Sequence, residues 1–331
     1  MPVASSVAAV SDTPSRTAAT GLATPLLEIQ DPALVESSGL AVSAVHDEVL
    51  WTHADGGRAA EVRAVGATGE TVAVITLAGI DPYDPEALAP GVDEAGQPAL
   101  FLGDVGDNLE QRPDVSIFRF TEPDELADST LEATWFRFTY PDGPHDAEAL
   151  LVHPRTGRML IATKDAGGGG LYRAPLDPVT AADGSNRLVR IAEVPLLVTD
   201  GAYLPDGRFA LRTYGSVFVY DRPGHQIATA TLPLQPQGES LAVDGDRLLV
   251  GSEGPQSAVY AVPLPGPVRG ASTTPTRAAE PREQREQLGR ASSDGTDDES
   301  TLRTAYRIVR VVAILVLLAA VVAYLRRSRR R

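Results

Sequence analysis

Short runs of alternating apolar and polar residues fill most of the chain between residues 24 and 264, and Gly, Pro or Asp separates one run from the next. A period of two with such breaks is typical of β-strands joined by turns. The runs form groups, each of which begins with an acidic or small residue before an apolar strand. The five openings are Glu36–Leu40, Asp84–Leu88, Asp146–Leu150, Thr199–Tyr203 and Gly238–Leu241.

The groups repeat at similar distances along the chain. With the last residue of each opening taken as equivalent, the intervals are 48, 62, 53 and 38 residues, which is the range that repeated four-stranded units occupy. This pattern predicts an all-β fold, a β-propeller of five blades. Six blades are the alternative, because the interval of 62 residues has room for irregular strands.

Only four groups contain a fourth strand of their own. The segment Pro25–Ile29 supplies the missing one, and we expect it to pair into the last blade and close the ring. Closure removes the exposed sheet edges that would otherwise template aggregation.

The composition divides the chain into five parts. We expect residues 1–23 to be a disordered N-terminus or the remnant of a leader, and residues 24–264 to form the propeller. We expect residues 265–305 to be a flexible charged linker, because they have too few apolar side chains to build a core. A transmembrane helix is predicted at 306–325, and a basic tail at 326–331.

The predicted membrane helix centres on Ile308–Leu325, which only Arg310 interrupts. Its length of about 27 Å matches a hydrocarbon core, and Arg310 can snorkel to the headgroups. The arginines that follow favour a cytoplasmic C-terminus that binds anionic lipid. We therefore expect a single-pass protein of the cell membrane with its propeller outside. Residues 1–23 lack a basic region typical of signal peptides, so a tail-anchored protein with a cytoplasmic propeller is the alternative.

Charge narrows the range of partners. Residues 24–264 contain 36 acidic and 15 basic side chains, a balance that repels nucleic acid and attracts cations. The chain has no cysteine, which excludes disulfides and thiolate metal sites. It has one lysine, Lys164, against 28 arginines.

The blade openings bring acidic side chains together. In a propeller the beginnings of the innermost strands face one side of the ring, so glutamates that are distant in sequence converge. Like charges in a confined site raise a carboxylate pKa unless a cation relieves the repulsion. A hard ion bound by oxygens meets that need, and Ca²⁺ suits it better than Mg²⁺; simple solvation of the carboxylates is the alternative. The predicted metal ligands are Ser38, Glu86, Glu148, Asp200 and Glu239.

Polar side chains in the turns of the same face are candidates for catalysis. Acids or a histidine could position water, and Lys164 and Arg212 could stabilise developing charge. Structural salt bridges and solvated loop positions are the alternatives for the same residues. The candidates are Asp104, Asp107, His145, Asp146, Lys164 and Arg212.

The axial pattern of Ser38, Glu86, Glu148 and Glu239 resembles that of the calcium-dependent apyrase family. The resemblance implies a five-bladed propeller with Ca²⁺ on its axis and hydrolysis of nucleoside diphosphates. The fourth blade departs from the family, with Gly201 where the family has serine. Phrases such as Gly103–Asn108 are also similar to bacterial propellers of the phytase-like and quinoprotein-like kind, which implies a fold more than an activity.

Two function classes follow. The favoured one is a membrane-anchored, extracytoplasmic binding module that presents its acidic face, with an axial Ca²⁺, to a protein or small-molecule ligand. The alternative is a Ca²⁺-dependent phosphohydrolase, apyrase-like or phytase-like, that uses the same face. No nucleophile elbow or phosphate-cradling glycine motif is present in the sequence, and fold alone does not define chemistry.

The predicted topology can be tested on intact cells. Protease added outside should remove the propeller while the C-terminal tail stays protected, because the helix crosses the membrane once. Immunoblotting with tags at both ends measures this. A propeller that survives until the cells are lysed would contradict the outward orientation.

Overall fold

The computed structural model describes residues 23–55 and 59–266. The chain divides into two units, Met1–Ser272 and Thr273–Arg331, and all described residues belong to the first. The predicted membrane helix, the basic tail and nearly all of the N-terminal and linker segments lie outside the described residues. Within those residues, no helix has the length and apolarity needed to span a bilayer.

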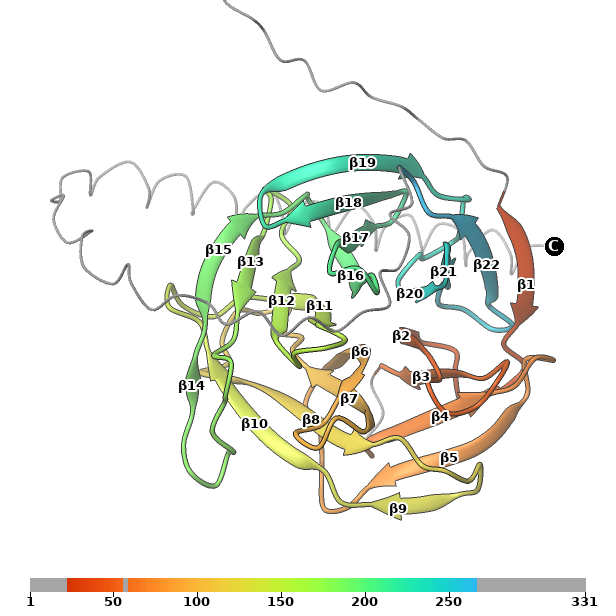
Figure 1. Ribbon diagram of the computed structural model, residues 1–331, viewed down its shortest axis with the longest axis horizontal. Helices are drawn as coiled ribbons and strands as arrows, with labels where there is room; N and C mark the ends of the chain where they lie inside the picture. Colours follow the sequence, from red (N-terminus) through yellow and green to blue (C-terminus); the bar gives the residue numbers. More distant parts are fainter. Residues whose placement is uncertain (1–22, 56–58, 267–331) are drawn as a thin grey trace, which may run out of the picture. The chain divides into compact units, whose positions relative to one another are not determined.

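Five sheets, each built on four antiparallel strands, surround a common axis and make a five-bladed β-propeller (Figure 1). Blade 1 contains β2 (Ser37–Val42), β3 (Leu50–Ala54), β4 (Glu61–Val65) and β5 (Thr71–Leu77). Blade 2 contains β6 (Pro85–Val92), β7 (Pro98–Asp104), β8 (Val115–Thr121) and β10 (Thr134–Thr139). Blade 3 contains β11 (Ala147–Val152), β12 (Met159–Thr163), β13 (Gly170–Arg173) and β15 (Val189–Glu193). Blade 4 contains β16 (Val198–Tyr203), β17 (Phe209–Thr213), β18 (Ser216–Arg222) and β19 (His225–Thr231).

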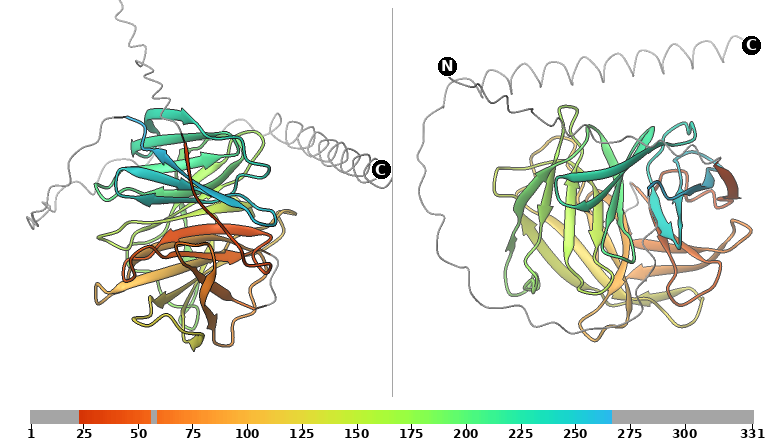
Figure 2. Two further views of the ribbon diagram at one scale, coloured as in Figure 1. Left: turned by 90° about the vertical axis from the view of Figure 1, so that its right-hand side faces the viewer. Right: turned by 45° about the horizontal axis from the view of Figure 1, so that its top comes forward.

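Blade 5 combines the two ends of the propeller. It contains β20 (Leu241–Asp244), β21 (Arg247–Val250), β22 (Ala258–Pro263) and, as its outer strand, β1 (Thr24–Glu28). β1 pairs antiparallel with β22, with Thr24 opposite Ala261 and Leu27 opposite Val259. Figure 2 shows this red strand beside the blue one. The predicted closure of the ring by an N-terminal strand is confirmed.

Two short strands were not predicted. β9 (Ser129–Leu131) lies parallel to β5 of blade 1, and β14 (Asn186–Arg187) lies parallel to β10 of blade 2. Each therefore becomes a fifth, outermost strand on the blade before its own. β9 lies within the interval of 62 residues, which therefore contains an excursion to a neighbouring sheet and leaves the number of blades at five.

The core lies between neighbouring blades. Successive side chains of a strand point to opposite faces of the sheet. In β12, Met159 and Ile161 therefore pack with blade 2, while Leu160 and Ala162 pack with blade 4. Because each sheet packs against a neighbouring blade on both sides, its strands are buried on both faces, and apolar residues outnumber polar ones in the middle of each blade.

A buried carboxylate links the first two blades. Glu122, directly after β8, accepts hydrogen bonds from the indole Nε1 of Trp51 at 2.7 Å and from the backbone N–H of Ala44 at 3.0 Å. The hydroxyl of Ser43 donates to the same carboxylate. Hydrogen bonds to a charged group contribute more than neutral ones, and leaving a buried donor unpaired is costly.

The substitution Glu122→Ala should therefore lower the free energy of unfolding by about 2–3 kcal/mol. Urea unfolding followed by Trp fluorescence measures the change. Glu125→Ala is the matched control, because Glu125 is exposed on the same loop, and it should change stability by less than about 0.5 kcal/mol. Equal effects of the two substitutions would contradict the role of Glu122.

Candidate functional site

The inner strands of blades 1 to 4 begin with a break in regular pairing. The register shifts between Ser37 and Leu40 in β2, around Glu86 in β6, around Glu148 in β11 and around Thr199 in β16. A bulge adds one residue to a strand and re-aims its side chain. The predicted ligands Ser38, Glu86 and Glu148 thus stand at equivalent bulges, while Thr199 holds that position in blade 4.

The bulges lie around one end of the axis, where Glu239 of blade 5 joins them. We call this end the acid mouth and define it by Ser38, Glu86, Glu148 and Glu239. All four side chains are buried. The Ser38 hydroxyl donates to Glu86 Oε2 at 3.1 Å. Glu148 acts electrostatically on Glu86, and Glu239 acts on Glu148. The structure therefore brings the three predicted glutamates together, from blades 2, 3 and 5.

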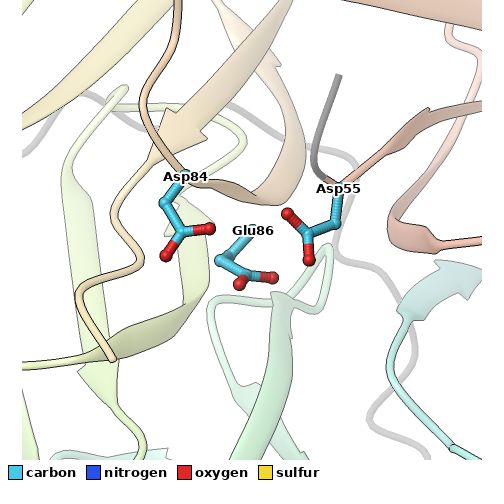
Figure 3. Close-up of side chains that lie close together, drawn as sticks. All are labelled: Asp55, Asp84 and Glu86. Carbon is cyan, nitrogen blue, oxygen red and sulfur yellow. The ribbon is translucent and has the colours of Figure 1, made fainter. Parts of the chain in front are cut away.

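A second group of carboxylates extends this mouth. Oxygens of Asp55, Asp84 and Glu86 all lie within 4.8 Å of one another, and Figure 3 shows the three side chains turned toward one another. We call this group the cation cluster. Asp55 follows β3, Asp84 precedes β6, and Glu86 belongs to both the cluster and the acid mouth.

Gly106 allows the neighbouring loop to pass close to the cation cluster. A Cβ atom built on Gly106 would lie 2.5 Å from Asp84 Oδ2 and 2.8 Å from Glu86 Cγ. Any side chain at this position would therefore push the two carboxylates apart. The glycine is required by the close approach of backbone and carboxylates.

Burial and mutual repulsion shape the protonation of the cluster. Burial, followed by the charges of Asp55 and Asp146, raises the pKa of Asp84 to about 6. Burial, followed by the charge of Glu148, raises the pKa of Glu86 well above its ordinary value. A cation that binds here displaces these protons to solvent, and its charge relieves the repulsion between the carboxylates.

Three of the catalytic candidates hold the loop around Gly106 in place. Asp104 Oδ1 accepts the Asp84 backbone N–H at 2.8 Å and Arg112 Nη1 at 2.9 Å. Asp107 Oδ2 accepts the Arg112 backbone N–H at 2.7 Å, and Asp146 Oδ1 accepts that of Asp107 at 2.9 Å. These aspartates position the wall of the cation cluster through backbone hydrogen bonds.

Lys164 lies at the other side of the acid mouth. Its ammonium donates to Glu148 Oε1, and it lies 5.4 Å from the centroid of the Tyr214 ring. Burial opposes its charge, but the carboxylates of Glu148 and Glu239 raise the pKa of Lys164 above its ordinary value. The lysine is therefore an ammonium ion at neutral pH.

The predicted ligand Asp200 is directed between blades 4 and 5. Its Oδ1 accepts the Gly201 backbone N–H at 2.7 Å, and its Oδ2 accepts that of Leu241 at 2.5 Å. The side chain is 1% exposed. Both oxygens therefore serve the blade interface, and Thr199 takes the position equivalent to Ser38, Glu86 and Glu148, where the sequence alignment placed Gly201 with Asp200 beside it.

Arg212 serves the same interface. It is wholly buried, and its guanidinium donates to the carbonyl of Ser240, to the carbonyl of Gly251 at 2.7 Å and to Gln235 Oε1 at 2.7 Å. Burial lowers its pKa to about 10, against the opposing charges of Asp200 and Glu239. Its Nη1 and Nη2 donors are thus engaged by blade 5 and the segment before it, while its Nε has no hydrogen-bond partner among the described residues.

His145 lies away from the acid mouth. Its Nε2 is 3.0 Å from Asp142 Oδ1 and 2.9 Å from the Tyr172 hydroxyl. The ring also makes an edge contact with Tyr140, at a centroid distance of 5.0 Å. The structure therefore places this candidate, which precedes Asp146 in the chain, in an aromatic cluster beside blade 3.

The opposite end of the axis has a different chemistry. A cavity of about 270 Å³ is lined there by the later residues of all five inner strands, among them Leu40, Leu88, Leu151, Tyr203 and Leu241. None of its lining residues is charged. The propeller axis therefore has one acidic end and one apolar end.

Comparison with known proteins finds structures similar to this β-propeller but identifies no family. No family model matches the chain. No curated protein matches it either. Among solved structures it is similar to a gluconolactonase from Xanthomonas campestris, at 16% identity over 76% of this chain and 100% of that one, with a TM-score of 0.42. It is also similar to a PQQ-bound aldose sugar dehydrogenase from Streptomyces coelicolor, at 11% identity over 75% and 99%, with a TM-score of 0.43.

A third structure is a calcium-binding protein, regucalcin, from Agrobacterium tumefaciens. The identity is 16%, the coverage is 72% of this chain and 93% of that one, and the TM-score is 0.40. Likenesses of this size say nothing about ligand or activity. The described chain is a β-propeller, and its function has to be inferred from its own residues.

The predicted metal set omitted Asp55 and Asp84. Asp84 belongs to the opening of the inner strand β6. Asp55 follows β3, the strand that pairs with the inner strand β2 of the preceding blade. Position next to the opening of an inner strand was the available signal. It was not sufficient, because the sequence shows the order of the blades but not the direction in which loop side chains point.

The raised pKa of Asp84 gives a pH-dependent stability. Because the folded-state pKa of about 6 lies above the ordinary 3.8, the folded protein binds the proton more tightly than the unfolded chain does. The contribution is present below about pH 4 and is lost as the pH rises to about 6. The thermal midpoint in EGTA should therefore fall over this range relative to Asp84→Asn. A difference that does not vary with pH would contradict the shift, and Asp47→Asn, at an exposed turn, is the control.

Proposed function

We propose that this protein is a membrane-anchored, extracytoplasmic binding module whose propeller holds Ca²⁺ at the acid mouth. The observation that carries the proposal is the cation cluster, in which oxygens from Asp55, Asp84 and Glu86 approach within 4.8 Å of one another. Membrane anchoring and orientation rest on the sequence of residues 306–331. The ligand would be a protein or a small molecule that meets the acidic face.

The donor set fits a hard cation. Three carboxylates and the nearby Ser38 hydroxyl offer only oxygen, which is the ligand that Ca²⁺ and Mg²⁺ prefer. Calcium–oxygen bonds of about 2.3–2.6 Å span about 4.6–5.2 Å across the ion, and magnesium–oxygen bonds span only about 4.2 Å. Oxygens within 4.8 Å of one another can reach either ion, and Ca²⁺ is favoured because it accepts irregular coordination, whereas Mg²⁺ demands near-ideal octahedral geometry.

The surroundings of the catalytic candidates favour binding over hydrolysis. Asp104, Asp107 and Asp146 hold backbone, Arg212 is engaged by blade 5, and His145 lies elsewhere. A phosphohydrolase needs cationic donors directed at the transferred group. The two cations expected for that task, Lys164 and Arg212, already have partners within the protein.

A Ca²⁺-dependent phosphohydrolase, apyrase-like or phytase-like, is the second candidate. The observation in its favour is the pKa of Asp84, which burial and then neighbouring acids raise to about 6. A carboxyl group that titrates near neutral pH can act as a general acid or base beside a metal ion. Under this alternative, Asp84 would move a proton while the cation binds phosphate.

Calorimetric titration of the full-length protein with Ca²⁺, after EGTA treatment, tests the binding proposal. Wild type should bind Ca²⁺ more tightly than Mg²⁺. Glu86→Gln and Asp84→Asn should each weaken binding at least about tenfold, because each removes a charged ligand. Asp47→Asn makes the same chemical change at an exposed turn and should bind like wild type.

Absence of Ca²⁺ binding, or equal affinity in all four proteins, would contradict the proposal. Phosphate release from UDP, GDP and phytate, with Ca²⁺ and with EGTA, separates the two candidates. The binding module predicts none. Release that requires Ca²⁺ and is lost in Asp84→Asn would establish the hydrolase.

A further inference from the structure

Lys164 is the one lysine in the sequence, and it lies at the acid mouth. It directly follows β12, and its backbone N–H donates to the Asp146 carbonyl at 2.9 Å. From there its ammonium reaches Glu148 Oε1 and the face of Tyr214. A chain that uses arginine almost everywhere else thus has its single lysine beside two axial glutamates.

The two glutamates near Lys164 come from different blades. Glu148 stands at the bulge of β11 in blade 3, and Glu239 precedes β20 in blade 5. They are 6% and 5% exposed, and each affects the pKa of the other. Both act electrostatically on the Lys164 ammonium. Two buried carboxylates that interact in this way need a positive charge or a proton between them.

The mouth is therefore divided into two halves of different composition. Blades 1 and 2 supply the cation cluster together with Ser38, in which all groups are oxygens. Blades 3 and 5 supply Glu148 and Glu239, and blade 3 also supplies an ammonium. An ammonium on a flexible stem is a compact point charge that can take the position of a metal ion.

We propose that Lys164 is an internal cation that takes the place of a metal ion between Glu148 and Glu239. The acid mouth then binds one divalent cation, at the cation cluster. Lys164 also weakens binding at that cluster, because like charges repel across a poorly solvated site. The effect of Lys164 on the cation cluster rests on the proposed function, whereas its place between Glu148 and Glu239 concerns those two residues alone.

Calcium titration of full-length variants tests the proposal. Lys164→Met should bind two Ca²⁺ ions where wild type binds one, and the first ion should bind about tenfold tighter. Lys164→Arg keeps the charge and should retain a stoichiometry of one. Arg222→Met removes a positive charge from a side chain that is 65% exposed at the end of β18, and it should behave like wild type.

A second variant tests the proposal even if Lys164→Met does not fold. Lys164→Met/Glu148→Gln deletes both members of the ion pair, so it should fold and bind one ion as wild type does. Loss of Ca²⁺ binding in this double variant would make Glu148 a metal ligand and overturn the proposal. A stoichiometry of one in folded Lys164→Met would overturn it as well.

The outcomes also separate this inference from the proposed function. If wild type binds no Ca²⁺ and Lys164→Met binds one ion that Lys164→Met/Glu148→Gln does not bind, the cation cluster is refuted and the role of Lys164 stands. If neither protein binds Ca²⁺, both statements are overturned. Circular dichroism and the thermal midpoint of each variant, with and without Ca²⁺, establish that the comparison is made on folded protein.

Discussion

Buried carboxylates at one end of the axis are the constraint on which the site depends. Bulges at the beginnings of β6 and β11 turn Glu86 and Glu148 out of regular pairing, and Glu239 joins them from blade 5. Charges removed from water require compensation. The protein supplies an ammonium from Lys164 to one half of this group and leaves oxygen ligands in the other. The same constraint thus explains a lysine, a candidate metal site and the pKa shifts of both halves.

The ring itself follows from packing. Each sheet buries both faces against its neighbours, so the alternation along a strand such as β12 divides its side chains between two cores. Closure by β1 fixes the last blade to the first part of the chain. Rigid walls of this kind hold loop residues from distant parts of the sequence at fixed positions, and the acidic and apolar ends of the axis are the result.

The sequence was sufficient for the parts of the fold that repeat. Period-two alternation and the spacing of the openings predicted the five blades and the closing strand, and the convergence of Glu86, Glu148 and Glu239 followed from the ring. It was not sufficient where register decides the outcome. A bulge leaves no mark in the hydrophobic pattern, so Gly201, with Asp200 beside it, was aligned with the axial positions although Thr199 stands at the bulge. The approach of Asp55 to Asp84 depends on the direction in which loop side chains point, and β9 and β14 are too short to show periodicity.

The position of a bound ion tests the central claim most directly. A crystal structure of the Ca²⁺-loaded protein, with Mn²⁺ as an anomalous substitute, would locate it. The account predicts one ion in contact with Asp55, Asp84 and Glu86, and the Lys164 ammonium between Glu148 and Glu239. An ion on the axis between Glu148 and Glu239, with Lys164 displaced, would contradict it.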